Sequence, residues 1–137
     1  RDSNRTGNAS GILVGGNLSI LNNLIGTEAD INTKGKILFL EDLDEYLYHI
    51  DRMMLHLKLA GKLKDIAGLI LGHFSDMKDN TIPFGKTAYQ IIADAVSEYN
   101  FPICYGFPVG HQFDNMALKV GIMAHLSVDE PKVIFTQ

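Results

Sequence analysis

The sequence predicts an α/β domain with a mixed sheet and flanking helices, and three observations support that class. Predicted strands and helices alternate along the chain, as they do when helices cover a sheet. The predicted strands Lys36–Leu40 and Ile66–Leu71 are unbroken apolar runs, typical of strands buried on both faces. The 137 residues, 46% of them hydrophobic, suit a single core.

The first ten residues are polar and rich in Asn, Ser and Gly, which predicts a linker or disordered start at 1–10 and a domain over 11–137. Ile12–Val14 predicts a short strand that the following glycine pair breaks. We expect Asn17 to cap a short helix that ends at Gly26.

The longest predicted helix follows the strand Lys36–Leu40. Asp42 and Glu45 have the spacing of a capping box, so we expect Asp42 to be the N-cap. Gly61 is the expected end of the helix. Apolar residues between these points repeat at helical spacing: Leu43, Tyr46, Leu47, Ile50, Met54 and Leu57.

The second half of the chain continues the alternation. A helix with one apolar face is predicted from Ala88 to Tyr99, followed by a short strand at Phe101–Tyr105. Gly106–Asn115 is a predicted loop. The strands Lys119–Val128 and Lys132–Thr136 close the chain as an expected hairpin.

Composition excludes several classes of function. The net charge is −4 without a run of like charges, so we expect no binding to nucleic acid or to anionic lipid. No apolar stretch approaches the roughly 20 residues that cross a bilayer, so no membrane segment is expected. The single cysteine, Cys104, has apolar neighbours and is predicted to lie in the core, consistent with a reducing compartment.

Glu41 is the first candidate for chemistry. It stands where the strand Lys36–Leu40 is expected to end, and catalytic groups often lie at the carboxyl ends of strands in α/β folds. The alternative is an acid that only stabilises the start of the following helix through its amides and dipole. Spacing alone leaves both interpretations open.

His111 is the second candidate, in the segment Gly106–Asn115, where two glycines and a proline restrict the backbone. An imidazole on such a loop can act as a general base. A surface histidine that contacts backbone is the alternative, and both remain open at this point.

Other motifs are weaker. Glu45 and His49 have the i, i+4 spacing of metal ligands, but no third ligand is evident. The segment Gly15–Asn17 could hold a phosphate, although a tight turn is the simpler interpretation. No serine lies in a Gly-x-Ser-x-Gly elbow. The sequence therefore offers a candidate acid and a candidate base but no nucleophile, and we expect neither cofactor nor metal.

Six stretches, taken together and in order, resemble the LD-carboxypeptidase family, which includes the self-immunity peptidases that inactivate microcin C. The resemblance that they carry extends over nearly all of the chain from Gly11 onward. The stretches are Gly15–Ser19, Gly26-Thr27, Ile37–Asp42, Tyr48–Met54, Gly68–Phe74 and Pro108–His111.

The resemblance implies a two-domain serine peptidase with a Ser-His-Glu triad. Glu41 matches the triad acid and His111 the triad base, whereas the serine belongs to an N-terminal nucleophile domain that this sequence does not contain. The chain begins with Arg1, without a methionine or a signal segment, and we expect it to be part of a longer protein. The implied fold is the swivelling β/β/α C-terminal domain, inactive when isolated.

The family removes a terminal D-alanine from L,D-linked murein tetrapeptides during cell-wall recycling, which implies a cytoplasmic enzyme and a homodimer as its full-length form. Two alternatives stay open. One is an antibiotic-inactivating peptidase of the microcin C type. The other is a non-catalytic ligand-binding or dimerisation domain that keeps the fold.

Overall fold

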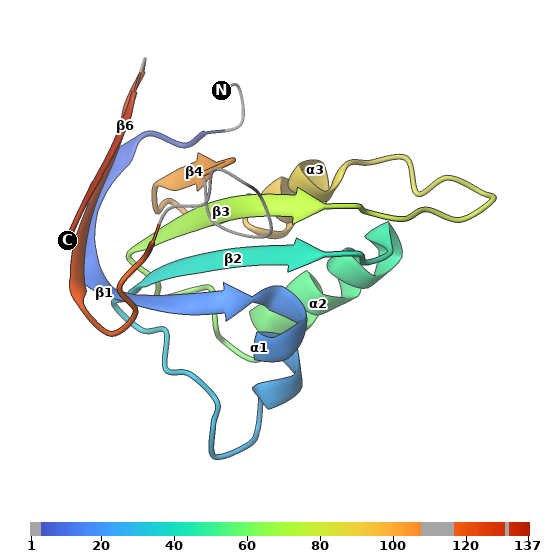
Figure 1. Cartoon of the computed structure of the whole chain (residues 1–137), viewed down its shortest axis with the longest axis horizontal. Helices are drawn as coiled ribbons and strands as arrows, with labels where there is room; N and C mark the ends of the chain where they lie inside the picture. The colour runs from blue at the N-terminus through green and yellow to red at the C-terminus, as the bar shows by residue number, and fades with distance from the viewer. Residues whose placement is uncertain (1–3, 108–116, 131) are drawn as a thin grey trace.

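A computed structural model gives the arrangement of residues 4–107, 117–130 and 132–137 (Figure 1). Strands and helices alternate through the first four strands, and two more strands follow. This confirms the predicted mixed α/β class. The elements are β1 (Gly7–Asn17), α1 (Leu18–Leu24), β2 (Ile37–Leu43), α2 (Leu47–Leu59), β3 (Gly68–Ser75), α3 (Ala88–Ala95), β4 (Ile103–Tyr105), β5 (Met123–Val128) and β6 (Val133–Thr136).

The six strands form one mixed sheet in the order β4-β3-β2-β1-β5-β6. The first four are parallel to one another, whereas β5 and β6 are antiparallel additions. Strand β1 belongs to both parts: residues 7–12 pair with β5, and residues 13–17 pair with β2. Figure 1 shows the sharp curve of β1 that brings the antiparallel hairpin around one side of the parallel strands.

The start of the chain differs from the expected linker over residues 1–10. Gly7–Ser10 is paired with β5, and Arg5 forms a bridge with Ile103. The side-chain oxygen of Asn4 also accepts a hydrogen bond from the backbone of Tyr105 at 2.8 Å. Polar composition suggested a free segment, but pairing with strands almost a hundred or more residues away orders it.

Two apolar clusters lie on opposite faces of the parallel strands. Alternate residues of β2 divide between them, as the period of a strand requires. Leu38 and Leu40 pack with the helices, whereas Ile37 and Phe39 pack toward β5 and Phe107. The buried Cys104 belongs to the second cluster, as the sequence predicted.

Local signals are confirmed at both ends of α1 and at the C-terminal end of α2. The side chain of Asn17 accepts a hydrogen bond from the backbone of Ile20, and Gly26 has φ 84° just after α1. Helix α2 ends with a Schellman motif, in which Gly61 (φ 75°) donates to Lys58 and Lys62 donates to Leu57.

The predicted capping box at Asp42 and Glu45 is wrong. Strand β2 continues through both Glu41 and Asp42 to Leu43, and α2 begins only at Leu47, after Tyr46. Pairing with β3 explains the difference, because Asp42 and Leu43 stand in register with Phe74 and Ser75. A capping box does occur at α3, between Thr87 and Gln90.

The remaining boundaries shift by a few residues. Strand β3 begins at Gly68, two residues after the expected start, and extends to Ser75. Helix α3 ends at Ala95, so Tyr99 lies beyond it. The closing hairpin is confirmed, with β5 beginning at Met123 rather than at Lys119. Within the part of the chain that the structure describes, no helix has the length and apolarity that crossing a membrane requires.

Candidate active site

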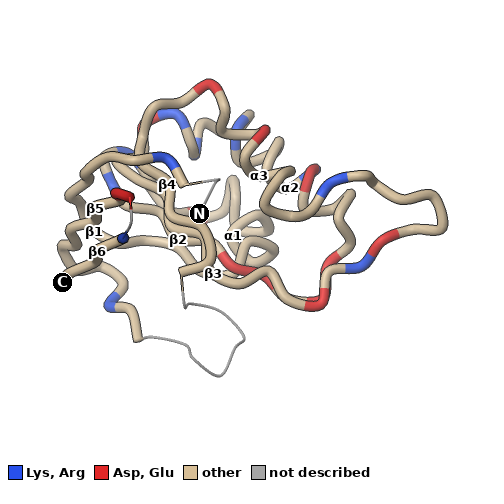
Figure 2. Tube along the Cα trace, turned by 90° about the horizontal axis from the view of Figure 1, so that it is seen from above, with Lys and Arg blue, Asp and Glu red and all other residues tan. Residues whose placement is uncertain are grey.

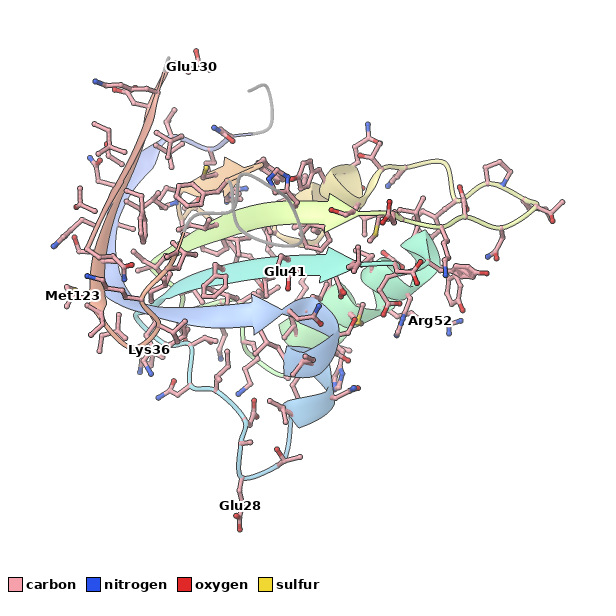
Figure 3. The ribbon with its side chains drawn as sticks, viewed as in Figure 1. Glu28, Lys36, Glu41, Arg52, Met123 and Glu130 are labelled. Carbon is pink, nitrogen blue, oxygen red and sulfur yellow. The ribbon has the colours of Figure 1, made fainter. Side chains whose placement is uncertain are left out.

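Glu41 lies near the carboxyl end of β2, with 8% of its surface exposed (Figure 3). It stands in register with Asn17, the last residue of β1. Its position in the alternation of β2 places it on the face of Ile37 and Phe39, opposite the helices. Glu41 is therefore a nearly buried carboxylate within a strand, not at the junction with a helix as the sequence suggested.

The sheet is irregular next to Glu41. Leu40 pairs with Leu71, but Asp42 pairs with Phe74, so β3 uses one residue more than β2 across this step. Gly72 and His73 together lie opposite Glu41, the arrangement of a β-bulge. Such bulges are common beside active sites, where they change the direction of a side chain.

His111 lies outside the described residues, but both flanks of its segment are described. Phe107 donates a backbone hydrogen bond to Leu71 at 2.9 Å, beside the bulge. Phe107 and Leu118 both belong to the apolar cluster of Phe39, on the face where Glu41 lies. The segment that carries His111 thus leaves and rejoins the fold on the Glu41 face of the sheet.

Asp42 points to the opposite face and is 2% exposed. Its carboxylate accepts hydrogen bonds from the side-chain amide of Asn17 at 3.0 Å and from the backbone of Leu43 at 2.8 Å. It also accepts from the backbone and hydroxyl of Ser19 at 3.0 and 2.6 Å. Sequence reasoning considered Asp42 only as the cap of α2, whereas the structure uses it at the start of α1.

The polar contacts continue outward from Ser19. Its hydroxyl also lies 2.9 Å from Oε1 of Glu45, and Oε2 of Glu45 lies 2.7 Å from Nδ1 of His49. The Glu45–His49 pair that suggested a metal site is thus a direct contact between the two side chains. Among the described residues, no group of three or more His, Cys, Asp or Glu side chains is arranged to hold a metal ion.

Acidic residues follow the ends of both β2 and β3, and Figure 2 shows these positions in red along the tube. Asp44 and Asp76 have φ values of 60° and 53°, a conformation that Asp adopts more readily than most residues. Lys78 crosses between the two loops, 2.8 Å from Asp44, and this hydrogen bond raises the pKa of its ammonium group. The loops are therefore fixed to one another beside the strand ends.

A pocket of roughly 430 Å³ opens where β3 ends and α3 begins. Its walls are largely apolar, and several come from the loop that projects on the right of Figure 1. The pocket is lined by Leu47, His73, Phe74, Ser75, Met77, Lys86, Thr87, Ala88 and Tyr89. His73 lines this pocket and also belongs to the bulge opposite Glu41.

The segment Gly15–Asn17 is neither a tight turn nor a phosphate loop, because β1 stays extended through Asn17. Gly15 has φ 141°, and a Cβ there would lie 2.0 Å from the carbonyl oxygen of Phe39. The glycine is thus explained by the close approach of β1 to β2. A Cβ on Gly16, by contrast, would meet nothing within 4 Å.

The family model described as the LD-carboxypeptidase C-terminal domain matches residues 10–126. The chain belongs to the LD-carboxypeptidase family. A probable murein peptide carboxypeptidase of Bacillus subtilis is 38% identical over 132 residues, which are 93% of this chain and 40% of the relative. The microcin C7 self-immunity protein MccF of Escherichia coli is 25% identical over 134 residues, 96% of this chain and 38% of the relative.

Solved structures agree with this membership. The muramoyltetrapeptide carboxypeptidase from Oxalobacter formigenes superposes with a TM-score of 0.87 and 36% identity, over 96% of this chain and 45% of the other. MccF superposes with a TM-score of 0.81 at 23% identity, over 90% of this chain and 37% of MccF. This similarity supports the fold alone. The LD-carboxypeptidase domain described above thus spans less than half the length of each of these relatives.

Proposed function

We propose that this chain is the C-terminal domain of a serine LD-carboxypeptidase and supplies Glu41 and His111 of a Ser-His-Glu triad. The serine would come from an N-terminal nucleophile domain of the same protein. The observation that carries the proposal is the placement of Glu41, nearly buried at the carboxyl end of a parallel strand. Both flanks of the His111 segment lie on the same face, which further supports the pairing.

The residue types fit the chemistry of acyl transfer. His111 takes the proton of the attacking serine and returns it to the leaving amine. Glu41 holds the imidazole in the required tautomer and stabilises its charged form. An acid that is largely withdrawn from water suits this role, because electrostatic interactions strengthen where water is excluded.

The proposed substrate is an L,D-linked murein tetrapeptide, from which the enzyme releases the terminal D-alanine during cell-wall recycling in the cytoplasm. Similarity to the murein peptide carboxypeptidase of B. subtilis favours this substrate over an antibiotic of the microcin C type. We also propose that the complete enzyme is a homodimer. The chain by itself is expected to release no D-alanine, since loss of the serine costs about a million-fold in turnover.

The test uses the complete protein with its nucleophile domain and measures D-alanine release from an L,D-tetrapeptide. His111→Ala should lower kcat by about a million-fold, and Glu41→Gln by about 10⁴-fold, the size of effect seen when a triad loses its orienting acid. His125→Ala serves as the control, because His125 is an exposed strand histidine that contacts only Ser10 among the hydrogen bonds described.

Each outcome discriminates between functions. Full release by His111→Ala would overturn the triad. No release by the unaltered protein, together with hydrolysis of an aminoacyl-sulfamoyl nucleoside, would replace the murein substrate with the antibiotic class. Inactivity of the unaltered protein on both substrates would favour a non-catalytic binding domain.

A further inference from the structure

Asp42 is a buried side chain with several hydrogen bonds beside Glu41, although the proposed chemistry does not use it. Its two carboxylate oxygens accept four hydrogen bonds, at 2.6 to 3.0 Å, from Asn17, Ser19 and Leu43. These donors lie at the end of β1, at the start of α1 and in β2 itself. A single buried carboxylate therefore joins three elements next to Glu41.

Capping of α1 accounts for only one of the four hydrogen bonds to Asp42, the one that the backbone of Ser19 donates in the first turn of the helix. Asn17 already accepts the hydrogen bond from Ile20 that an N-cap provides. Burial of an ionised carboxylate is unfavourable unless hydrogen bonds compensate, and a neutral side chain would avoid that cost. The four donors around Asp42 meet this requirement, and three of them are not backbone amides of α1: the Asn17 amide, the Ser19 hydroxyl and the backbone of Leu43.

The β-bulge shows why rigidity matters here. The pairing of β2 with β3 changes register between Leu40 and Asp42, so the ladder is interrupted on the β3 side of Glu41, whereas the register with Asn17 of β1 is kept. A strand residue normally owes its position to ladder hydrogen bonds on both sides. At this point Asp42 holds the backbone from the opposite face of the strand, one residue beyond Glu41.

We propose that Asp42 is a positioning residue: by fixing the end of β2 to Asn17 and Ser19, it sets the orientation of the Glu41 carboxylate. This inference rests on the proposed role of Glu41 as triad acid. Triad geometry must be held closely, since a displacement of about 1 Å can reduce turnover by about 100-fold. Asp42 contributes to the reaction only through Glu41.

The Ser19 hydroxyl offers a milder way to loosen the same anchor. It lies within hydrogen-bonding distance of both Asp42 and Glu45 but carries one proton, so it donates to one carboxylate at a time. Ser19→Ala removes this contact and leaves the other three donors to Asp42. It should weaken the anchor without exposing an unpaired charge.

The experiment measures kcat and KM for D-alanine release by the complete two-domain protein. Thermal unfolding gives the folded fraction of each variant, and kcat is expressed per folded molecule. Asp42→Asn should lower kcat by about 10- to 100-fold with KM within about twofold. Ser19→Ala should lower kcat about threefold to tenfold, in the same direction. Glu28→Gln, a change at an exposed carboxylate, is the matched control and should leave kcat unchanged.

A double-mutant cycle distinguishes positioning from a merely structural role. In the Glu41→Gln background, Asp42→Asn and Ser19→Ala should cause no further loss, because both act through Glu41. Losses that multiply with that of Glu41→Gln would overturn the inference, as would an unchanged kcat in both variants. If Asp42→Asn does not fold, the Ser19→Ala arm of the cycle decides alone.

The proposed function and the positioning role of Asp42 can be tested separately. Full activity of Glu41→Gln would remove the triad and the inference together. Loss of activity in Glu41→Gln, combined with unchanged turnover in the Asp42 and Ser19 variants, would remove the inference only.

Discussion

The two ends of the parallel strands β1, β2 and β3 are built differently. At the amino end, β2 and β3 pair in regular register from Ile37 and Gly68. Nearby, Lys62 forms an ion pair with Asp30, and the hydroxyl of Thr33 donates to the backbone carbonyl of Lys62. At the carboxyl end, Glu41 and Asp42 are buried carboxylates and the ladder carries a bulge. Carboxylates are costly to bury, and both of the buried carboxylates among the described residues lie at this end.

The comparison separates chemistry from stability in an α/β domain. Ligands in such folds bind beyond the carboxyl ends of the strands. Changes at the amino end should therefore lower the free energy of unfolding and leave turnover per folded molecule unchanged. Changes at the carboxyl end should alter turnover, except where they obstruct the pairing of β1 with β2.

The largest effect on stability is expected for Gly15→Ala. The new methyl group would lie 2.0 Å from the carbonyl oxygen and 2.8 Å from the amide nitrogen of Phe39, and neither backbone atom can move freely. We expect a loss of at least about 4 kcal/mol in unfolding free energy, measured by urea denaturation of this chain.

Gly16→Ala is the control for Gly15→Ala. Gly16 has a similar φ of 151° but open space around its Cβ position, so only backbone strain of about 1–3 kcal/mol applies. Equal losses in the two variants would show that φ, and not the approach of β1 to β2, requires the glycines.

A smaller effect is expected at the amino end, for Thr33→Val. Thr33 is 4% exposed, and its hydroxyl donates to the carbonyl of Lys62 at 2.7 Å. Replacing it should destabilise the domain by about 1–2 kcal/mol, because a buried hydrogen bond is lost while the volume is retained. D-alanine release per folded molecule by the complete protein should not change, and a fall in kcat would contradict the division between the two ends.

The smallest effect concerns Asp30, which lies 2.9 Å from the ammonium of Lys62. The hydrogen bond from Lys62 lowers the pKa of Asp30 below its ordinary value of 3.8. A lowered pKa stabilises the folded state at pH values above the ordinary pKa. This contribution disappears as the pH falls through the folded-state pKa.

Asp30→Asn should therefore cost about 1 kcal/mol at neutral pH and almost nothing near pH ~2. Thermal unfolding of both proteins across this pH range measures the difference, with Glu28→Gln as the control at an exposed site. A difference that is constant with pH would show that the ion pair does not cause it.

Much of the local structure could be predicted because its causes are local. Asn17 and Gly61 act on backbone groups within one helical turn, so their roles are visible in the sequence. Asp42 and Glu45 show the limit of such signals. Their spacing fits a capping box, but the pairing of β2 with β3 extends the strand through Asp42. The carboxylate of Asp42 accepts a hydrogen bond from the first turn of α1 instead.

The candidate site divides in the same way. The sequence singled out Glu41 and His111 through their place after a strand and in a restricted loop, and the family resemblance joined them. The structure adds the near-burial of Glu41 and the bulge opposite it, and His111 itself lies outside the described residues. Ser19 entered the sequence analysis only as the end of the stretch Gly15–Ser19, because nothing local indicates a partner 23 residues away.

The sequence by itself determined the α/β class, the cap of α1, the end of α2 and the family, because hydrophobic periodicity, capping residues and motifs are properties of neighbouring residues. Only the tertiary structure decided that Gly7–Ser10 belongs to a strand, that Glu41 and Asp42 face opposite sides of β2, and that Asp42 anchors α1. These features depend on strand register and on partners distant in the chain. Register is settled when the whole sheet buries its apolar faces together.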